Sequence, residues 1–264
     1  MVLHKIKKLF ILVVLIHSAT FSSEKFELIT TLYNEKNPER RSELLYTLSM
    51  NLLSPVINKI HIFYELTKDP NDETLNEIYS YNETGKIIVN FITSRPSFFS
   101  LIEYANKNLK NKKIIISNGD ILFDESIQKA SFQSLKKSFF CLSRYNFYND
   151  IWDLDANYFT KSSKQYSASF DSWIFSTPIT NFAAKEFIMG TIGCEKFVFN
   201  ALLKGIELKN PCKEILCYHI HQSNLRNYVI KDNYMNVPFV YLPYSYMDEK
   251  IAPIMSKYYI PADK

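Results

Sequence analysis

The segment at residues 114–124, IIISNGDILFD, combines residue types that suit metal chemistry. Asp120 follows a run of apolar residues, and Gly119 beside it lets backbone come close to a ligand. Such a carboxylate suits a hard cation, Mg²⁺ or Mn²⁺, because that cation takes its remaining ligands from water and from substrate phosphates. Asn118-Gly119-Asp120 is equally a favoured turn sequence, so the tripeptide alone leaves a metal site and a plain turn both open.

Two further carboxylates stand next to predicted structural boundaries. Asp171 precedes the apolar run SWIF, where an acid can orient a hydroxyl, act as a base or simply begin a strand. Glu195 follows the glycine-containing turn at residues 190–194 and leads into a predicted helix. A carboxylate near a helix N-terminus is electrostatically favourable without any catalytic task, so Glu195 also has two interpretations.

His219 and His221 form a pair in the sequence Tyr-His-Ile-His. On a strand, residues two apart point to the same face, which would let both rings bind one metal ion or a phosphate. A structural pair is the alternative, because the spacing of zinc hydrolases is missing. No GxSxG, P-loop, GxGxxG or HExxH motif occurs either. The usual sequence motifs therefore give no support to four classes of protein: serine hydrolases, nucleoside triphosphatases, dinucleotide-dependent enzymes and zinc hydrolases.

The elements that must position these residues alternate between apolar strand-like runs and helical patterns, which is typical of an α/β protein. Strands are predicted at residues 26–33, 59–64, 87–92, 113–117, 139–143, 172–175 and 215–221. Helices are predicted at residues 39–53, 72–79, 97–109 and 197–203, the third of them capped by Ser94 or Ser97.

The strand predicted at residues 113–117 is apolar without alternation, as in a strand covered on both faces. The Asn118–Asp120 tripeptide follows its carboxyl end, and open α/β sheets bind ligands beyond the carboxyl ends of their strands. Residues 144–165 are polar, aromatic and irregular, which predicts a loop over this site.

Length and charge limit the class of protein. With 264 residues, 47% of them hydrophobic, one sizeable core is expected, and residues 24–264 are predicted to form a single domain. The net charge of +4 arises from 31 basic and 27 acidic residues spread along the chain. Because there is no basic stripe, nucleic acid is not expected as a partner.

The N-terminal residues 1–23 have the order of a signal peptide. Lysines precede the apolar run at residues 9–16, and small and polar residues follow it. The run is shorter than the roughly 20 residues of a membrane span, which favours cleavage over a short signal anchor. A buried segment at the domain edge is the third alternative. We expect export to a secretory lumen (ER or Golgi), the periplasm or the medium, with membrane contact only through an uncleaved N-terminal segment.

The four cysteines fit either of two states. In an oxidising compartment an even number can form disulfides, and Cys212 and Cys217 are the closest pair along the chain. Small buried thiols are the alternative. A cysteine metal site is not expected, because no second closely spaced pair accompanies these two.

Short motifs follow one another along the chain in an order that resembles a known family. They are TLYNE at residue 31, SRPSFFSLIEYAN at 94, IIISNGDILFD at 114, LSRY at 142, DSWIF at 171, GTIGCE at 190, NPC at 210 and HIHQS at 219. Over residues 26–228 the chain resembles glycosyltransferase-like proteins of the GT-A, nucleotide-diphospho-sugar transferase type. The resemblance implies a Rossmann-like, mostly parallel central sheet flanked by helices.

The same resemblance implies a glycosyltransferase of hexosyltransferase type, with a UDP- or GDP-sugar as donor and Mn²⁺ or Mg²⁺ as cofactor. Asn118-Gly119-Asp120 corresponds to the DxD-like metal motif, with Asn in place of the first Asp. His219 and His221 correspond to a late His-x-His that would close the metal or diphosphate side. Asp120, His219 and His221 are therefore the candidate metal ligands.

The remaining candidate residues are assigned by position in the family pattern. Tyr33, Asn34 and Glu35 would face the nucleotide base, and Arg95 would neutralise the diphosphate, for which a forked guanidinium is suited. Asp171 or Glu195 would orient or deprotonate an acceptor hydroxyl. In the glycine turn the chain has Glu195-Lys196 where the family pattern has Asp-Asn.

Two other functions stay open at this level, besides transfer to a glycan, protein or lipid acceptor. One is a non-catalytic module of the same fold that binds a glycan or nucleotide through its aromatic-rich segment at residues 144–166. The other is a metal-dependent phosphodiesterase or other hydrolase that uses Asp120, His219 and His221.

Overall fold

A computed structural model describes residues 24–148, 151–155, 157–180, 187–223, 237–258 and 260. Residues 1–23, for which a signal peptide or anchor is predicted, lie outside the described residues. Within the part of the chain that the structure describes, no helix has both the length and the apolar character that a membrane span requires.

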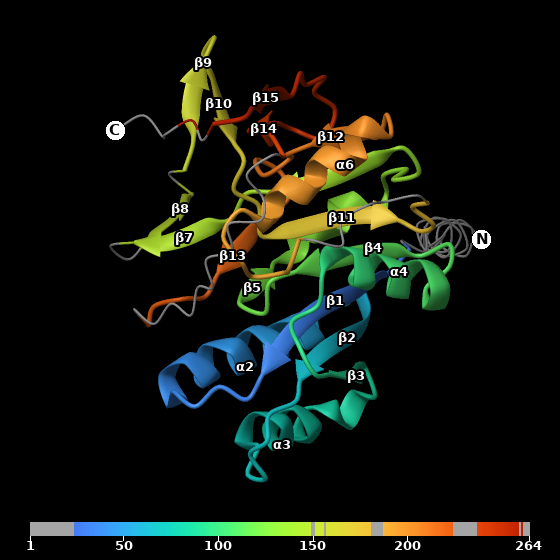
Figure 1. Cartoon of the computed structure of the whole chain (residues 1–264), viewed down its shortest axis with the longest axis vertical. Coiled ribbons are helices and arrows are strands. Elements are labelled where there is room, and N and C mark those ends of the chain that lie inside the picture. Colours follow the sequence, from blue (N-terminus) through green and yellow to red (C-terminus); the bar gives the residue numbers. More distant parts are fainter. Residues whose placement is uncertain are drawn as a thin grey trace, which may run out of the picture.

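A seven-stranded sheet forms the centre of the molecule (Figure 1). In sheet order its strands are β12 (Glu207–Lys209), β6 (Ser138–Leu142), β11 (Ser172–Ser176), β4 (Lys113–Ser117), β1 (Phe26–Tyr33), β2 (Ile57–Glu65) and β3 (Ile87–Ile92). β11 runs antiparallel to both of its neighbours, whereas the other adjacent pairs are parallel. The mostly parallel sheet predicted from the sequence is confirmed.

Helices cover both faces of this sheet, and each face has its own core. The helices are α2 (Pro38–Leu53), α3 (Glu73–Ser80), α4 (Phe98–Asn108), α5 (Gln128–Ser131) and α6 (Val198–Leu203), with short 3-10 helices η1 (Asn82–Thr84), η2 (Glu125–Ile127) and η3 (Cys194–Phe197). Because side chains alternate along β1, Leu28 packs in the core with α2, and Ile29 packs in the core with α4 and α6.

The two long helices begin where side chains satisfy their first backbone N–H groups. Asn37 precedes Pro38 and accepts a hydrogen bond from the backbone N–H of Arg40 at 2.9 Å. Ser97 does the same for α4 through the N–H of Ser100 at 3.2 Å, so Ser97 rather than Ser94 is the cap. These caps fix the start of α2 and α4 directly beside the ends of strands β1 and β3.

The loop predicted at residues 144–165 is wrong, because this segment forms strands. They are β7 (Tyr145–Tyr148), β8 (Ile151–Leu154), β9 (Phe159–Lys161) and the start of β10 (Lys164–Ser167). β7 and β8 belong to one small sheet, in which β7 also pairs with β13 (Cys217–His219) and β13 pairs with β5 (Ile121–Phe123). β9 and β10 belong to a second small sheet, in which β10 also pairs with β14 (Phe239–Pro243) and β14 pairs with β15 (Ile254–Ser256). Partners about 70 residues away stabilise these strands, and a local pattern does not show them.

The late strand is also shorter than predicted. Residues 215–221 were expected to be extended, but the backbone N–H of Ile215 bonds to the carbonyl of Pro211 in a turn, and β13 covers only Cys217–His219. His221 therefore lies beyond the strand. All four cysteines are free and buried, which is the second of the two states considered.

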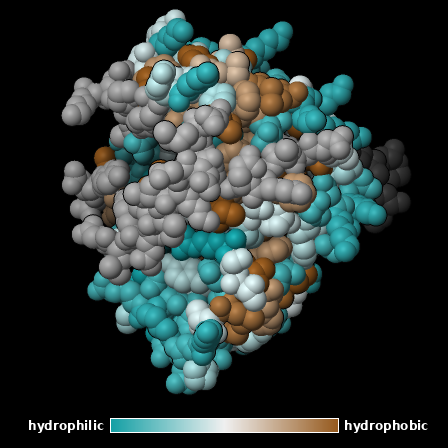
Figure 2. Space-filling view, in the orientation of Figure 1, coloured by the Kyte–Doolittle hydropathy of each residue, from teal (hydrophilic) through white to brown (hydrophobic). Residues whose placement is uncertain are grey.

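The surface carries apolar residues along the open edge of the sheet. Ile88 and Phe91 of the edge strand β3 are exposed, as is Leu66 after β2. Figure 2 shows hydrophobic residues gathered on the lower half of this face, where Figure 1 places β3. The candidate site lies elsewhere, at the carboxyl ends of β1 and β4.

Candidate active site

A pocket of about 620 Å³ opens where β1 and β4 end. Every residue predicted to form the site contributes to its wall except Asn34, which is buried beside it. The wall residues predicted from the sequence are Tyr33, Glu35, Arg95, Asn118, Gly119, Asp120, Asp171, Glu195, His219 and His221. Segments up to 188 positions apart, from Tyr33 to His221, therefore meet at one concave surface.

One end of the pocket, which we call the Asp120 corner, holds Asp120, His219 and His221. Oδ2 of Asp120 lies 3.2 Å from Nε2 of His219 and 3.8 Å from Nδ1 of His221. One ligand atom from each of the three residues lies within 4.8 Å of the others. Although His221 is outside the strand, both imidazole rings face the carboxylate, with their centroids 5.3 Å apart.

Gly119 is required by close packing of the Asn118–Asp120 turn against β1. A Cβ atom at this position would lie 2.7 Å from the carbonyl oxygen of Thr31 and 2.9 Å from the side chain of Leu32. The backbone N–H of Ile121 bonds to the carbonyl of Asn118 at 3.3 Å, so the tripeptide is also a turn. The turn and the pocket wall are thus the same feature, and the two interpretations of the tripeptide do not conflict.

Arg40 belongs to the Asp120 corner and was missed from the sequence. It lies in the first turn of α2, and its guanidinium pairs with Asp120 at 2.5 Å and with Glu43 at 2.8 Å. A cation in the first turn of a helix is unfavourable for the helix dipole. This unfavourable position of a cation is the feature of the sequence that could have identified Arg40 as a candidate site residue. It does not show that the partner of Arg40 is Asp120, 80 residues away.

The first turns of α2 also hold the chain that follows β13. Arg40 donates to the carbonyl of Ile220 at 3.1 Å, and Glu43 accepts the backbone N–H groups of Gln222 and Ser223, each at 2.7 Å. Because His221 lies between these contacts, α2 fixes the position of the segment that carries it.

Asp120 is held in its charged form. Burial alone would raise its pKa, but the charge and hydrogen bond of His219 and those of Arg40 together hold the pKa well below the ordinary value of an aspartate. An ionised carboxylate beside two imidazole rings is the state that binding a cation requires.

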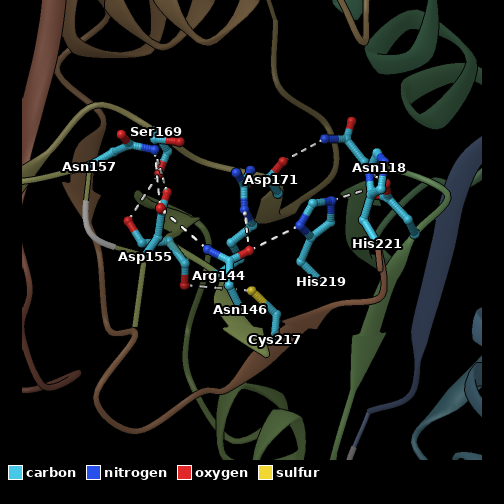
Figure 3. A network of polar contacts seen from close by, with 12 residues as sticks. Asn118, Arg144, Asn146, Asp155, Asn157, Ser169, Asp171, Cys217, His219 and His221 are labelled. Carbon is cyan, nitrogen blue, oxygen red and sulfur yellow. Dashed lines mark hydrogen bonds and ion pairs between the residues drawn. The ribbon is translucent and has the colours of Figure 1, made fainter. Parts of the chain in front are cut away.

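Asp171 lies in the middle of the pocket with both carboxylate oxygens engaged. Oδ1 accepts a hydrogen bond from Nδ2 of Asn118 at 2.7 Å, and Oδ2 accepts one from Arg144 at 2.5 Å (Figure 3). The backbone N–H of Asn118 also bonds to the carbonyl of Asp171 at 3.1 Å. With both oxygens held by donors, the carboxylate of Asp171 has a fixed position in the pocket wall.

A second part of the pocket wall, which we call the Glu195 corner, surrounds its carboxylate in a different way. Glu195 is half-buried at the start of η3, directly after Gly193, whose φ of 78° places the turn in the left-handed region. Burial and, to a lesser degree, the negative charge of Asp171 raise the pKa of Glu195 to about 7. A carboxyl group with this pKa exchanges protons near neutral pH, which is the property of a general base.

The residues predicted to face a nucleotide base lie at the end of β1. Tyr33 donates to Glu35 at 2.8 Å, and burial together with this bond raises the pKa of Tyr33 to about 12. The side-chain oxygen of Asn34 is buried and has no partner among the described residues. Arg95 donates a hydrogen bond to the carbonyl oxygen of Gly190 at 3.3 Å, and its Nε lies 3.9 Å from the carboxylate of Glu65.

Four connected polar residues were also missed: Arg144 and Asn157 line the pocket, and Asn146 and Asp155 are buried. Asn146 contacts His219, Arg144 and Asp155, and Asn157 donates to Asp155 at 3.1 Å (Figure 3). All four residues fall in the segment interpreted as a loop. Only Asn146 lies on a strand, β7, whereas Arg144 and Asp155 stand just outside β7 and β8, so no alternation in the sequence marked them.

The Asp120 corner was tested for its fit to a divalent cation. One carboxylate oxygen and two imidazole nitrogens converge within 4.8 Å, and the ring of His219 is supported on its far side by Asn146, as metal-bound histidines usually are. The donor types and their convergence fit a divalent cation with open positions for substrate oxygens.

No protein-family model and no curated protein sequence matches the chain. Among solved structures, S. aureus TarS residues 1–349 in complex with UDP-GlcNAc is similar, with a TM-score of 0.52 and 14% identity over 76% of this chain and 60% of that one. A mannosyltransferase from Pyrobaculum calidifontis in complex with GDP-Man and Mn²⁺ gives a TM-score of 0.48 and 10% identity over 76% of this chain and 58% of that one.

These similarities concern the fold. The chain covers about three-fifths of the length of the TarS structure. At 14% identity the similarity shows a shared architecture and does not show a shared activity. The protein has a GT-A type, glycosyltransferase-like fold, as the sequence motifs implied.

Proposed function

We propose that the protein is a glycosyltransferase that moves a sugar from a nucleotide-diphosphate donor to an acceptor hydroxyl with the help of a divalent cation. The observation that carries the proposal is that one pocket combines a cation-binding set with a carboxylate whose pKa is about 7. The GT-A type fold supports it, and the similar TarS structure is a complex with UDP-GlcNAc.

In the proposed donor site, Asp120, His219 and His221 hold the cation. When bound there, the cation would neutralise negative charge on the departing diphosphate. Two imidazole nitrogens beside a single carboxylate favour a transition-metal ion such as Mn²⁺ over Mg²⁺, which prefers oxygen ligands. Arg40, which already pairs with Asp120, adds a fixed positive charge on the same side.

The donor's nucleotide is assigned to the end of β1. Tyr33 and Glu35 line the pocket there, and the unpartnered oxygen of Asn34 lies behind them. Arg95 supplies a second guanidinium in the same wall. These residues lie beyond the carboxyl end of a central parallel strand, where α/β proteins bind nucleotides.

In the proposed reaction, Glu195 takes the proton of the acceptor hydroxyl. The acceptor oxygen then forms a bond with the anomeric carbon of the sugar, the bond from that carbon to the diphosphate breaks, and the electron pair leaves with the diphosphate. Asp171 accepts two hydrogen bonds already and is assigned to orient the hydroxyl or Arg144 rather than to remove a proton. The acceptor is a hydroxyl of a glycan, protein or lipid.

A matched pair of aspartates from one segment tests the proposal. Asp120→Asn should abolish Mn²⁺-dependent release of nucleoside diphosphate from UDP- or GDP-sugars. Asp124→Asn should keep it, because Asp124 caps η2 and bonds to Tyr218 outside the pocket. If the wild-type protein releases no nucleoside diphosphate with any of these donors and acceptors, the proposal fails.

A metal-dependent phosphodiesterase is the second candidate, because a carboxylate with two histidines also suits metal-assisted hydrolysis of a phosphoester. It predicts hydrolysis of bis(p-nitrophenyl) phosphate by the wild type and loss in Asp120→Asn. A binding module predicts nucleotide-sugar binding without turnover, and the same assays separate the three outcomes.

A further inference from the structure

A chain of buried polar contacts leads from the back of the pocket to His219. Asn146 on β7 is 6% exposed and Asp155 after β8 is 4% exposed. Nδ2 of Asn146 lies 3.3 Å from Oδ1 of Asp155, and Oδ1 of Asn146 lies 3.0 Å from Nδ1 of His219. Figure 3 shows this arrangement, with Asn146 between Arg144 and His219.

Two neighbours determine which way the amide of Asn146 faces. An ionised carboxylate only accepts hydrogen bonds, so the amide nitrogen must face Asp155. A guanidinium only donates, and Nε of Arg144 lies 3.1 Å from the amide oxygen. Both contacts require the same orientation, and that orientation presents an acceptor to His219.

The amide orientation in turn selects the tautomer of His219. Because Oδ1 of Asn146 can only accept, Nδ1 of His219 must carry the hydrogen. Nε2 then faces Oδ2 of Asp120 at 3.2 Å, where it donates a hydrogen to the carboxylate in the metal-free protein and offers a lone pair once a cation displaces that hydrogen.

We propose that Asn146 is a positioning residue that holds His219 as the Nδ1–H tautomer and so presents Nε2 to a divalent cation shared with Asp120. The inference rests on the metal-dependent part of the proposed function and adds a residue outside the ligand set. Arg144 extends the effect, since it bonds to both Asn146 and Asp171 and so ties the orientation of the amide to the middle of the pocket.

The hydrogen on Nδ1 can be measured directly in the metal-free protein. At pH 8.5, ¹⁵N-edited NMR of the histidine rings should show a hydrogen on Nδ1 of His219. In Asn146→Leu this preference should disappear, because the acceptor is lost. A bare Nδ1 in the wild type, or an unchanged Nδ1–H in the variant, would overturn the proposal.

The second measurement is Mn²⁺ affinity, followed by the electron paramagnetic resonance signal of free Mn²⁺. Asn146→Leu should bind Mn²⁺ about 10–100-fold more weakly, which is the usual effect of removing a partner behind a metal-bound histidine. Asn106→Leu is the matched control: this amide also makes two hydrogen bonds, to the backbone of Ile179, but lies outside the pocket wall. Equal affinities in the two variants would count against Asn146.

A charge-neutral exchange separates positioning from a loss of folding. Asn146→Asp combined with Asp155→Asn keeps an acceptor toward His219 and Arg144 and keeps one amide and one carboxylate in the pair. This double variant should recover most of the Mn²⁺ affinity and the Nδ1–H tautomer, and failure to recover both contradicts the proposal.

The outcomes distinguish this inference from the proposed function. If the wild type binds Mn²⁺ and the Asn146→Leu variant binds it equally well, only the inference fails. If Mn²⁺ binding responds to Asn146 but no nucleotide sugar is turned over, glycosyl transfer fails and the inference stands. If the wild type binds no Mn²⁺, both are wrong.

Discussion

Asp120 and Glu195 are two carboxylates in the wall of one pocket, and their surroundings affect them in opposite directions. Arg40 and His219 lie against Asp120 and hold its pKa below the ordinary value, whereas Glu195 is buried near Asp171 and its pKa rises to about 7. Burial alone raises the pKa of both groups. The difference therefore comes from the charged partners, and it is the basis for the roles proposed above, cation binding for Asp120 and proton transfer for Glu195.

The two corners are also built in different ways. The Asp120 corner joins α2, the end of β4 and the end of β13, so its contacts span up to 180 positions in the sequence. The Glu195 corner comes mainly from the single turn at residues 190–195. The Asp120 corner thus depends on the whole fold, and the Glu195 corner depends on one local turn.

Replacing the base should have the largest effect. Glu195→Gln keeps the size of the side chain and removes its ability to take a proton, so kcat should fall by about 10²–10⁴-fold. Donor affinity, measured by calorimetry, should change little because the cation ligands remain. A variant that keeps kcat but loses donor affinity would assign Glu195 to binding and would break the comparison.

The pH profile should show the same group. Because the base works in its deprotonated form and its pKa is about 7, kcat should fall about tenfold per pH unit below that value, or about 100-fold at pH 5. The rate above pH 8 should be level. A profile that is flat between pH 5 and 8 would show that no group with this pKa limits the reaction.

Stability should change in opposite directions at the two corners. The folded pKa of Glu195 is raised above the ordinary value of 4.5, so its contribution to stability is complete below pH 4.5 and is lost as the pH rises through about 7. At pH 8, Glu195→Gln should therefore be more stable than the wild type by about 1–3 kcal/mol, and at pH 4.5 the gain should disappear. Urea unfolding at both pH values measures this.

Asp120→Asn should instead destabilise the metal-free protein at pH 8 by about 2 kcal/mol. It leaves the buried Arg40 with only one carboxylate partner, Glu43, and loss of a full buried pair typically costs about 3–5 kcal/mol. Urea unfolding of Asp120→Asn and Glu195→Gln in the same buffer should give shifts of opposite sign. Shifts of the same sign would contradict the assignment of the two corners.

Adding Mn²⁺ should stabilise the folded protein, and it should act on one corner only. At a concentration 100-fold above its Kd, a ligand that binds only the folded state stabilises it by about 2.7 kcal/mol. The resulting rise in Tm should occur in Glu195→Gln and be lost in Asp120→Asn, and a chelator should reverse it. A rise that persists in Asp120→Asn would place the cation elsewhere.

The sequence predicted the parts of the fold that are local. β1, β3 and β4 have the predicted bounds. For β4 the reason is that a strand buried on both faces is a continuous apolar run between polar boundaries. The position of Asp120 at the pocket followed from the rule for strand ends, without any contact being known. The sequence therefore placed the Asn118–Asp120 turn at the pocket, but it did not identify the residues that contact this turn in the folded protein.

What the sequence did not predict depends on distant pairing. Arg40 forms an ion pair with Asp120 only because α2 packs beside the end of β4. The strands within residues 144–165 form because they pair with β13 and β14. Asn146 was missed for this reason. The pKa of Glu195 likewise depends on burial and on Asp171, which the turn sequence does not show.

The most direct test of the account is calorimetric titration of UDP- and GDP-sugars into the protein with and without Mn²⁺. The account predicts that at least one donor binds the wild type and Glu195→Gln only when Mn²⁺ is present, and that Asp120→Asn loses this Mn²⁺-dependent binding. Binding that is independent of both Mn²⁺ and Asp120, or no binding of any donor, would contradict it.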